Sequence, residues 1–252
     1  MTAECLLVLI PTYDEVANIE SLIGRLRAAV PDADILVVDD ASPDGTGAVV
    51  AQLAARDSQV HLLSRGRKQG LGAAYVAGYV WGLERSYGVF VQMDADGSHR
   101  PEQLPGLLEA LTTADLVLGS RWVAGGSVVN WPRRRMLLSR AGNRYTRVLL
   151  GLPVRDATGG FRVLRRATVE GLDLQSVASS GYSFQVDVVY RAVCAGCRVV
   201  EVPITFLERE RGMSKMSKVV VCEALWRVTS WGLVRRGSGV RDVLSKATRR
   251  MV

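Results

Sequence analysis

The sequence predicts an α/β fold with an open, mostly parallel sheet that is flanked by helices. Short, continuous apolar runs alternate with stretches of helical periodicity, and acidic or glycine-rich turns follow the apolar runs. Continuous apolar runs are typical of parallel strands that helices bury on both faces. Right-handed crossovers arrange such strands in one sheet, and ligands then bind beyond the carboxyl ends of the strands.

The first half of the chain holds the regular part of this pattern. The run LLVLI (6–10) is the first expected strand, and a helix with one apolar face follows it at 17–29. Four further strands are expected, and a helix is expected after each of the first three of them. These strands are expected at 35–39, 60–64, 89–93 and 116–120, and the helices at 46–56, 71–85 and 101–111.

After Arg121 the pattern is less regular, and residues 125–135 are expected to form a mobile loop. The elements expected after it are a helix at 136–150, a turn with a short strand at 156–166, a helix at 184–195 and a strand at 197–204. We expect a single domain over residues 1–235 that ends in an amphipathic helix at about 217–235. The basic tail at 236–252 is expected to fray.

Composition and charge limit the classes of function. At 252 residues the chain is long enough for one large α/β domain. Its formal net charge of +7 favours anionic partners such as nucleic acid, anionic lipid or phosphorylated small molecules. No run reaches the ~18 apolar residues of a membrane span, and no secretory signal is apparent. The protein is therefore expected to be soluble or to sit on a membrane surface.

The cysteines and histidines argue against a zinc site. One C-x-x-C pair is present, Cys194 and Cys197, and the histidines are His61 and His99. Zinc would need a second cysteine pair or matching histidines. Because Cys194 and Cys197 lie in an apolar pattern, they are expected as buried thiols in a reducing cytosol.

Two aspartates follow the fourth expected strand, in the stretch QMDADGSHRP (92–101). Residues i and i+2 of a strand point to the same side, so the carboxylates of Asp94 and Asp96 are expected to converge. Carboxylates forced together repel one another unless a cation lies between them, and hard oxygen donors favour Mg²⁺ or Mn²⁺. The alternative is a polar turn that leads into the next helix at Pro101.

Other strand ends supply groups that suit a nucleoside diphosphate. Asp39 and Asp40 end the second strand at the same edge of the sheet, and Tyr13 follows the first strand, where its ring is suited to stack on a base. Neither the dinucleotide-binding G-x-G-x-x-G pattern nor a P-loop is present. Cations suited to a diphosphate are expected from Arg121, Arg209 and Lys215.

Eight motifs, in order, together resemble the dolichol-phosphate (polyprenol-phosphate) mannosyltransferases, which are family-2 glycosyltransferases with the GT-A fold. The resemblance covers about residues 5 to 220. The motifs are VLIPTYDEVANI, ILVVDDASPDGTG, KQGLGAAYVAGY, VQMDADGSHRPEQLP, LVLGSRWVAGG, SRAGNRYTRVLLG, DATGGFRVLRR and FLERERGMSKMS.

The resemblance implies transfer of mannose from GDP-mannose to a polyprenyl monophosphate, with inversion at the anomeric carbon and a Mg²⁺ or Mn²⁺ cofactor. Asp96 and Arg121 are the catalytic residues that it implies, and Arg121 would face the acceptor phosphate or the donor diphosphate. Relatives often carry glutamine at the position of Ser98, so a third metal contact from the shorter serine is expected to pass through water. The implied nucleoside contacts are Pro11, Tyr13, Glu15, Val38 and Asp40; the metal and diphosphate site comprises Asp94, Ala95 and Asp96; and Arg209 and Lys215 would bind the donor phosphates.

The proposed chemistry needs no general base. A phosphate monoester, with a second pKa near ~6, is already an anion at neutral pH, whereas an alcohol acceptor would need deprotonation. His99 lies in a turn, and the sequence leaves open whether it is structural. For Asp156 a helix cap, a loop organiser and an orienting carboxylate all remain open.

A lipid acceptor requires contact with a membrane surface. Six arginines fall within fifteen residues around the helix at 136–150, without an acidic residue among them, which suits anionic lipid; a solvated face is the alternative. The acceptor-phosphate and membrane candidates are Arg133, Arg135, Ser139 and Arg140. Trp226 and Trp231 lie on a wide apolar face at 219–234, either in the core or at the membrane interface.

Three other functions fit part of the sequence. The same fold with UDP-glucose as donor is the nearest alternative, and a non-catalytic subunit that binds nucleotide or lipid is a second. Nucleic acid is not an expected partner, because the basic residues lack interleaved aromatic residues. A cytoplasmic protein, peripheral on the inner face of the cell membrane, is expected. The sequence leaves open whether a separate membrane protein recruits it.

Overall fold

The computed structural model describes residues 5–174, 182–208 and 225–233. The first part of the helix expected at 217–235 and the basic tail at 236–252 lie outside these residues. Arg209 and Lys215 lie outside them as well, so their expected roles at the donor phosphates rest on the sequence alone.

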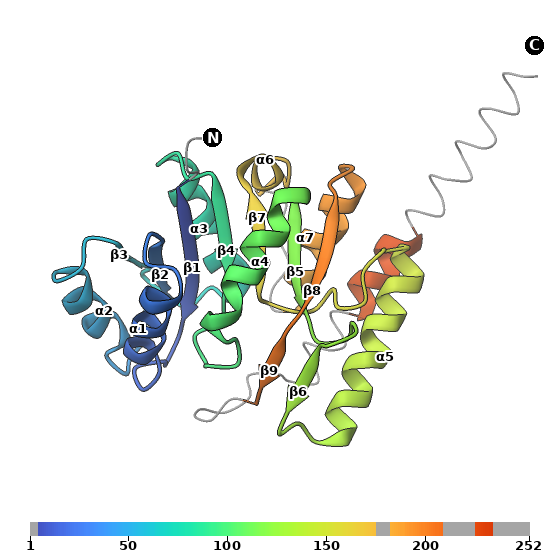
Figure 1. Ribbon diagram of the computed structural model, residues 1–252, viewed down its shortest axis with the longest axis horizontal. Helices are drawn as coiled ribbons and strands as arrows, with labels where there is room; N and C mark the ends of the chain where they lie inside the picture. The colour runs from blue at the N-terminus through green and yellow to red at the C-terminus, as the bar shows by residue number, and fades with distance from the viewer. Residues whose placement is uncertain (1–4, 175–181, 209–224, 234–252) are drawn as a thin grey trace, which may run out of the picture.

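The centre of the molecule is a seven-stranded sheet with the strand order β3-β2-β1-β4-β7-β5-β8 (Figure 1). Strand β7 runs antiparallel to β4 and β5, and the other neighbouring pairs are parallel, which confirms the predicted mostly parallel sheet. The strands are β1 (Leu6–Thr12), β2 (Asp34–Asp39), β3 (Val60–Ser64), β4 (Val89–Gln92), β5 (Leu116–Ser120), β7 (Arg162–Arg165) and β8 (Val199–Pro203).

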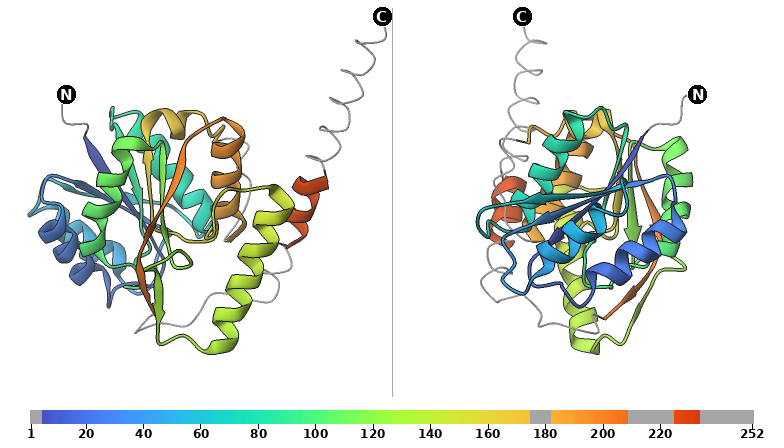
Figure 2. Two further views of the ribbon diagram at one scale, coloured as in Figure 1. Left: turned by 45° about the vertical axis from the view of Figure 1, so that its right-hand side comes forward. Right: turned by 90° about the vertical axis from the view of Figure 1, so that its left-hand side faces the viewer.

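Helices cover both faces of this sheet (Figure 2). Leu7 and Leu9 of β1 pack on one side with α3 and α7, while Val8 and Ile10 pack on the other side with α1, α2 and α4. This alternation is the two-residue period of a strand whose faces are both buried. The helices are α1 (Ile19–Ala29), α2 (Thr46–Ala54), α3 (Leu71–Leu83), α4 (Leu104–Ala110), α5 (Arg133–Leu150), α6 (Arg166–Glu170) and α7 (Tyr182–Cys194), and short 3₁₀ turns at Pro101–Gln103 and Leu111–Thr113 flank α4.

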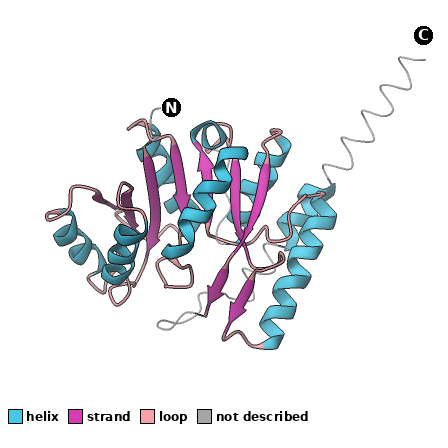
Figure 3. Cartoon of the chain, viewed as in Figure 1, coloured by secondary structure: helices cyan, strands magenta, loops and turns pink. Residues whose placement is uncertain are grey.

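The expectation of a mobile loop at 125–135 is wrong. Residues Ser127–Val129 form β6, which pairs in parallel with β9 (Thr205–Leu207), and α5 already begins at Arg133 (Figure 3). The Ser127 amide donates to the Ile204 carbonyl oxygen at 2.9 Å, so the ribbon joins segments that are distant in sequence. Local periodicity does not reveal such a pairing.

The described C-terminal residues 225–233 are helical and pack beside α5. Tyr145 and Thr229 share a hydrogen bond of 2.7 Å between their hydroxyl oxygens, and a Cβ on Gly232 would lie 2.6 Å from the side chain of Leu149. Trp231 stacks on Tyr190 with ring centroids 6.0 Å apart. The two tryptophans of this segment therefore differ, since Trp226 is 71% exposed.

The expectation that both thiols of the C-x-x-C pair are buried is also wrong. Cys194 is exposed and Cys197 is half-buried. Cys194 is the last residue of α7, and Gly196, at φ 80°, reverses the chain directly after it. The pair therefore lies at a surface turn between α7 and β8.

Candidate active site

The expected nucleoside residues meet at the carboxyl ends of β1 and β2. Pro11 pairs with Val38, and the Asp40 amide donates to the Thr12 carbonyl oxygen at 3.1 Å. The Val38 side chain is fully buried and packs with Leu9 and α3, so only its main chain is left for a contact with a nucleoside. The nucleoside contact that the resemblance implies for Val38 stays a prediction, and the main chain would make it.

Asp40 holds the loop 65–70 against this edge. Its Oδ2 accepts hydrogen bonds from the amides of Gln69 and Gly70 at 2.9 and 3.0 Å, and its Oδ1 lies 2.8 Å from the Arg65 guanidinium. The loop carries Lys68, whose ammonium lies 3.5 Å from the centre of the Tyr13 ring. The sequence contains the basic run SRGRKQG, but it does not predict the contact of this run with Tyr13.

Glu15 lies in the turn before α1 and is 9% exposed. Its amide donates to Thr46 Oγ1 at 3.0 Å, and its carbonyl oxygen accepts hydrogen bonds from Asn18 and Ile19. The Asn18 side-chain amide donates to Glu15 Oε2 at 2.9 Å. These bonds fix the turn that carries Tyr13, next to the expected nucleoside position.

Asp94 and Asp96 lie in the turn just beyond β4, which ends at Gln92, and not in the strand itself. Asp94 is half-buried and accepts a weak hydrogen bond from the Tyr75 hydroxyl at 3.4 Å, whereas Asp96 is 6% exposed. The Ser98 amide donates to Asp96 Oδ1 at 3.0 Å. Ala95 packs in the core, so its implied diphosphate contact is restricted to its main chain.

The donor set at this turn fits Mg²⁺ or Mn²⁺. Among the described residues no group of three or more His, Cys, Asp or Glu side chains gathers that could hold a metal ion. Two carboxylates with the remaining positions open to water and phosphate oxygens suit a cation that prefers to share its shell with a substrate. Gly160 lies beside the turn, since a Cβ there would be 3.1 Å from Asp94 Oδ2.

Arg121 and Asp156 form a buried ion pair at the end of β5. The Arg121 Nε and Nη2 donate to the two carboxylate oxygens of Asp156, both at 2.7 Å, and the Arg121 amide donates to Oδ2 at 3.0 Å. Burial raises the pKa of Asp156, but the charge and hydrogen bonds of Arg121 outweigh burial and leave the pKa below its usual value. Of the roles left open for Asp156, the orienting carboxylate is the one that these contacts favour.

Aromatic rings surround the Arg121 guanidinium. The ring centres of Trp122, Trp131 and Phe206 lie 5.6, 5.5 and 5.2 Å from its central carbon. These rings come from the turn after β5, the turn before α5 and strand β9, so the sequence alone did not bring them together. The planar guanidinium is thereby fixed both by a carboxylate and by aromatic faces.

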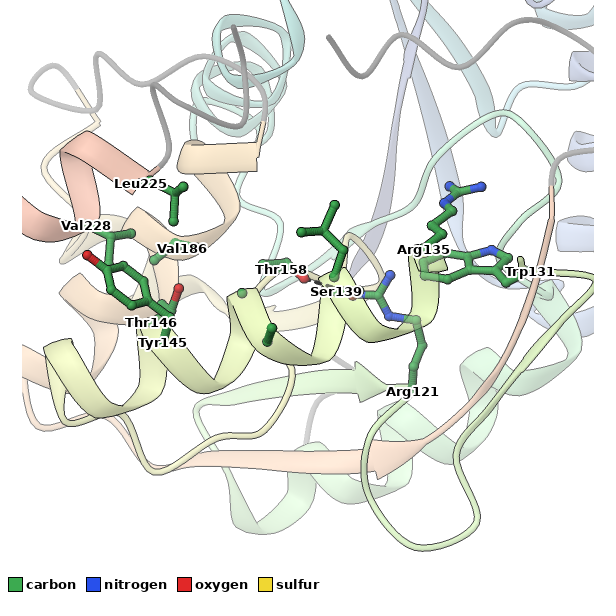
Figure 4. Close-up of a pocket in the computed structure, with 13 residues that line it drawn as sticks. Arg121, Trp131, Arg135, Ser139, Tyr145, Thr146, Thr158, Val186, Leu225 and Val228 are labelled. Carbon is green, nitrogen blue, oxygen red and sulfur yellow. Dashed lines mark hydrogen bonds between the residues drawn. The ribbon is translucent and has the colours of Figure 1, made fainter. Parts of the chain in front are cut away.

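A cavity of about 340 Å³ extends from Arg121 along α5 (Figure 4). The cavity is mostly apolar; Arg121, Arg135 and Ser139 lie at one end, and Tyr145, together with apolar residues of α7 and the 225–233 helix, lines the other end. Arg135 also pairs with Glu208 at 2.8 Å. Of the other two acceptor candidates, Arg133 is exposed, and the exposed Arg140 lies over the Trp122 ring at 4.9 Å.

The sequence profile of the family Glycosyl transferase family 2 matches residues 7–172, which include the Asp94–Asp96 turn, Arg121 and Asp156. The chain belongs to glycosyltransferase family 2. This glycosyltransferase is 57% identical over 235 residues to the undecaprenyl-phosphate mannosyltransferase of Micrococcus luteus, covering 93% of this chain and 97% of the relative. It is 52% identical over 240 residues to the polyprenol monophosphomannose synthase of Mycolicibacterium smegmatis, covering 94% and 91%.

Solved structures support the fold of the glycosyltransferase. Glucosyl-3-phosphoglycerate synthase from Mycobacterium tuberculosis, in complex with Mn²⁺, UDP and glucosyl-3-phosphoglycerate, superposes with a TM-score of 0.66 at 20% identity, covering 93% of this chain and 81% of the other. A mannosyltransferase from Pyrobaculum calidifontis, in complex with GDP-Man and Mn²⁺, gives 0.57 at 17%, covering 98% and 80%. The predicted GT-A fold is thereby confirmed.

Gly160→Ala is expected to weaken metal binding by the glycosyltransferase. The added methyl would lie 3.1 and 3.2 Å from the carboxylate oxygens of Asp94 and would displace them. We expect roughly tenfold weaker Mn²⁺ affinity in the presence of GDP, measured by electron paramagnetic resonance of free Mn²⁺. The control is Gly24→Ala, where a Cβ meets nothing within 4 Å. Unchanged affinity in Gly160→Ala would argue against Asp94 as a metal ligand.

Proposed function

We propose that this glycosyltransferase transfers mannose from GDP-mannose to a polyprenyl monophosphate, with inversion at the anomeric carbon, and forms polyprenyl-phosphate-mannose. The observation that carries the proposal is the cavity with Arg121 and Arg135 at one end and apolar side chains at the other. Such a cavity suits a phosphate on an apolar chain. Two relatives, the undecaprenyl-phosphate mannosyltransferase and the polyprenol monophosphomannose synthase, support mannose as the sugar and a polyprenyl phosphate as the acceptor.

In this proposal Arg121, Arg135 and Ser139 bind the acceptor phosphate, which attacks as an anion without a general base. Asp156 keeps the Arg121 guanidinium in one orientation, so that little reorganisation is needed when the two anionic substrates meet. Asp94 and Asp96 would hold Mg²⁺ or Mn²⁺, which neutralises the leaving diphosphate. Tyr13 and Lys68 line the expected nucleoside position.

The apolar end of the cavity provides the contact for the polyprenyl chain. Leu138, Tyr145 and Leu225 are 56, 39 and 43% exposed, although they also line the cavity. Exposed apolar side chains that gather at a cavity rim mark a place where an apolar ligand or a membrane can bind. The chain of the lipid is therefore proposed to leave the cavity between α5 and the 225–233 helix.

The outer surface of α5 and the 225–233 helix is proposed to lie on the inner face of the cell membrane. No helix among the described residues is long and apolar enough to cross a bilayer. Exposed apolar and basic side chains alternate on this surface, as in helices that lie in the interface of an anionic membrane. The exposed members are Arg133, Arg134, Leu137, Arg140, Arg144, Arg147, Val148, Trp226 and Leu233.

Changing Arg144 and Arg147 together to serine is expected to weaken binding to anionic vesicles. At about 1 kcal/mol for each basic residue near the surface, the loss corresponds to roughly 30-fold in the partition coefficient at low salt. Vesicle co-sedimentation measures it. Arg56 and Arg85, exposed residues just after α2 and α3, give a control with the same change of charge when both are changed to serine. An equal loss in both variants would argue against this surface.

Transfer assays decide the donor and the acceptor. Purified protein with Mg²⁺ or Mn²⁺ is offered GDP-mannose or UDP-glucose, each with undecaprenyl phosphate. We expect mannosyl lipid from GDP-mannose and little product from UDP-glucose. Turnover with UDP-glucose alone would overturn the mannose assignment, and no transfer from either donor would favour a subunit that binds without catalysing.

A further inference from the structure

His99 lies between the Asp94–Asp96 turn and the aromatic rings around Arg121. The ring is 1% exposed, and its Nδ1 accepts a hydrogen bond of 3.1 Å from the Asp94 amide. It stacks on Phe161 at 5.2 Å between ring centres and meets Phe206 edge-on at 5.3 Å. Phe206 in turn lies 5.4 Å from Trp131, so one imidazole contacts both parts of the site.

The Asp94 amide lies just beyond the last hydrogen bond between β4 and β1. The Met93 amide still donates to the Leu9 carbonyl oxygen of β1 at 3.1 Å, but β4 has ended, and the next amide donates to His99 instead. A buried amide without a partner would cost about 1–3 kcal/mol. The imidazole therefore replaces a strand as the partner of the first carboxylate-bearing residue in the turn.

Packing alone does not account for a histidine at this position. Because Nδ1 accepts a hydrogen bond, a neutral ring carries its proton on Nε2. Within the described part of the chain Nε2 is buried and has no hydrogen-bond partner. A phenylalanine would stack equally well without a polar atom left unsatisfied. The group that a phenylalanine lacks is the acceptor at Nδ1.

We propose that His99 is a positioning residue that holds Asp94 in place for the divalent cation through Nδ1. This inference rests on the proposed function, because it assumes that Asp94 is a metal ligand. Gly160 completes the arrangement, since a Cβ there would touch both the Asp94 carboxylate and, at 3.3 Å, His99 Cε1. The His99 ring and the Asp94 carboxylate thus both pack against the main chain of Gly160, where there is no side chain.

Two substitutions separate the hydrogen bond from the packing. In His99→Asn the side-chain oxygen stands near the place of Nδ1 but the ring is lost, whereas His99→Phe keeps a ring but has no acceptor. We expect His99→Phe to bind Mn²⁺ with GDP about 10–100-fold more weakly than wild type and His99→Asn to retain most of the affinity. We expect the melting temperature of His99→Phe to be higher than that of His99→Asn, because phenylalanine keeps the packing of the ring. If His99→Phe binds Mn²⁺ as tightly as wild type, or more tightly than His99→Asn, the proposal is overturned.

The tautomer gives a test that is independent of metal. In protein with ¹⁵N-labelled histidine, the His99 ring is expected to carry its proton on Nε2, with the second signal assigned through His61→Gln. A proton on Nδ1 would overturn the proposal.

Wild-type protein that binds Mn²⁺ with UDP but not with GDP would overturn the proposed donor alone, and the two variants would then be compared with UDP. Wild-type protein that binds Mn²⁺ with neither nucleotide would overturn both.

Discussion

Asp96→Asn is expected to reduce mannosyl transfer by about 10³-fold or more. In the proposed mechanism, loss of a carboxylate that holds the metal would remove several kcal/mol of stabilisation from the developing charge on the diphosphate. The fold should persist, because the asparagine oxygen can still accept the hydrogen bond from the Ser98 amide. Steady-state assays with GDP-mannose and polyprenyl phosphate measure the effect.

The exposed Asp32 provides the matched control, since Asp32→Asn makes the same change of charge away from the sheet edge. Thermal unfolding of both variants is expected to stay close to that of wild type. Wild-type turnover in Asp96→Asn would remove the proposed role of the Asp94–Asp96 turn.

Asp156→Asn is expected to lower the free energy of unfolding by about 3–5 kcal/mol, because it leaves the charge of Arg121 buried without its carboxylate. Arg121 is 5% exposed and Asp156 is fully buried, so solvent does not compensate for the loss. Chemical denaturation measures this change. Transfer is expected to fall as well, since the guanidinium is no longer held in one orientation.

A double-mutant cycle separates stability from catalysis. Arg121→Met and Asp156→Leu are each expected to destabilise the protein, whereas the double variant Arg121→Met/Asp156→Leu removes both charges and should recover most of the lost stability. Transfer should remain abolished in the double variant. If the double variant loses as much unfolding free energy as the two single variants together, the two residues are not coupled and the prediction fails.

The contribution of this pair also depends on pH. The pKa of Asp156 in the folded protein lies below its ordinary value, so its stabilisation is fully present above the unfolded-state pKa. That stabilisation is lost as the pH falls through the folded-state pKa. The difference in unfolding free energy between wild type and Asp156→Asn should therefore be constant near neutral pH and shrink in acid.

Local patterns predicted most of the strands and the edge at which the site lies. Apolar runs identified β1 to β5, because a strand buried on both faces leaves a clear signal in sequence. The Asp94–Asp96 turn was placed at the right edge, although it lies beyond the strand and not within it. Most of the site residues that the resemblance implied, Arg209 and Lys215 excepted, lie among the described residues, and their roles remain predictions.

Contacts between distant segments could not be predicted in this way. The pairing of β6 with β9, the ion pair of Arg121 with Asp156, and the rings of Trp122, Trp131 and Phe206 each join residues that share no local period. The side chains of Val38 and Ala95, for which the resemblance implies contacts with the donor, belong to the core, so their main chains would make those contacts. Whether a side chain at a strand end is buried depends on the segments that pack against it, and the sequence of the strand alone does not predict those segments.

The place of β7 between β4 and β5 sets a distance within the proposed site. Asp94 follows β4 and Arg121 follows β5, and β7 lies between these two strands. With neighbouring strands about 4.8 Å apart, the two strand ends stand about 10 Å from one another. This spacing separates the Asp94–Asp96 turn, the proposed diphosphate side of the site, from Arg121, the proposed acceptor side, and β7, whose first residue lies at that edge, brings Asp156 and Gly160 between them.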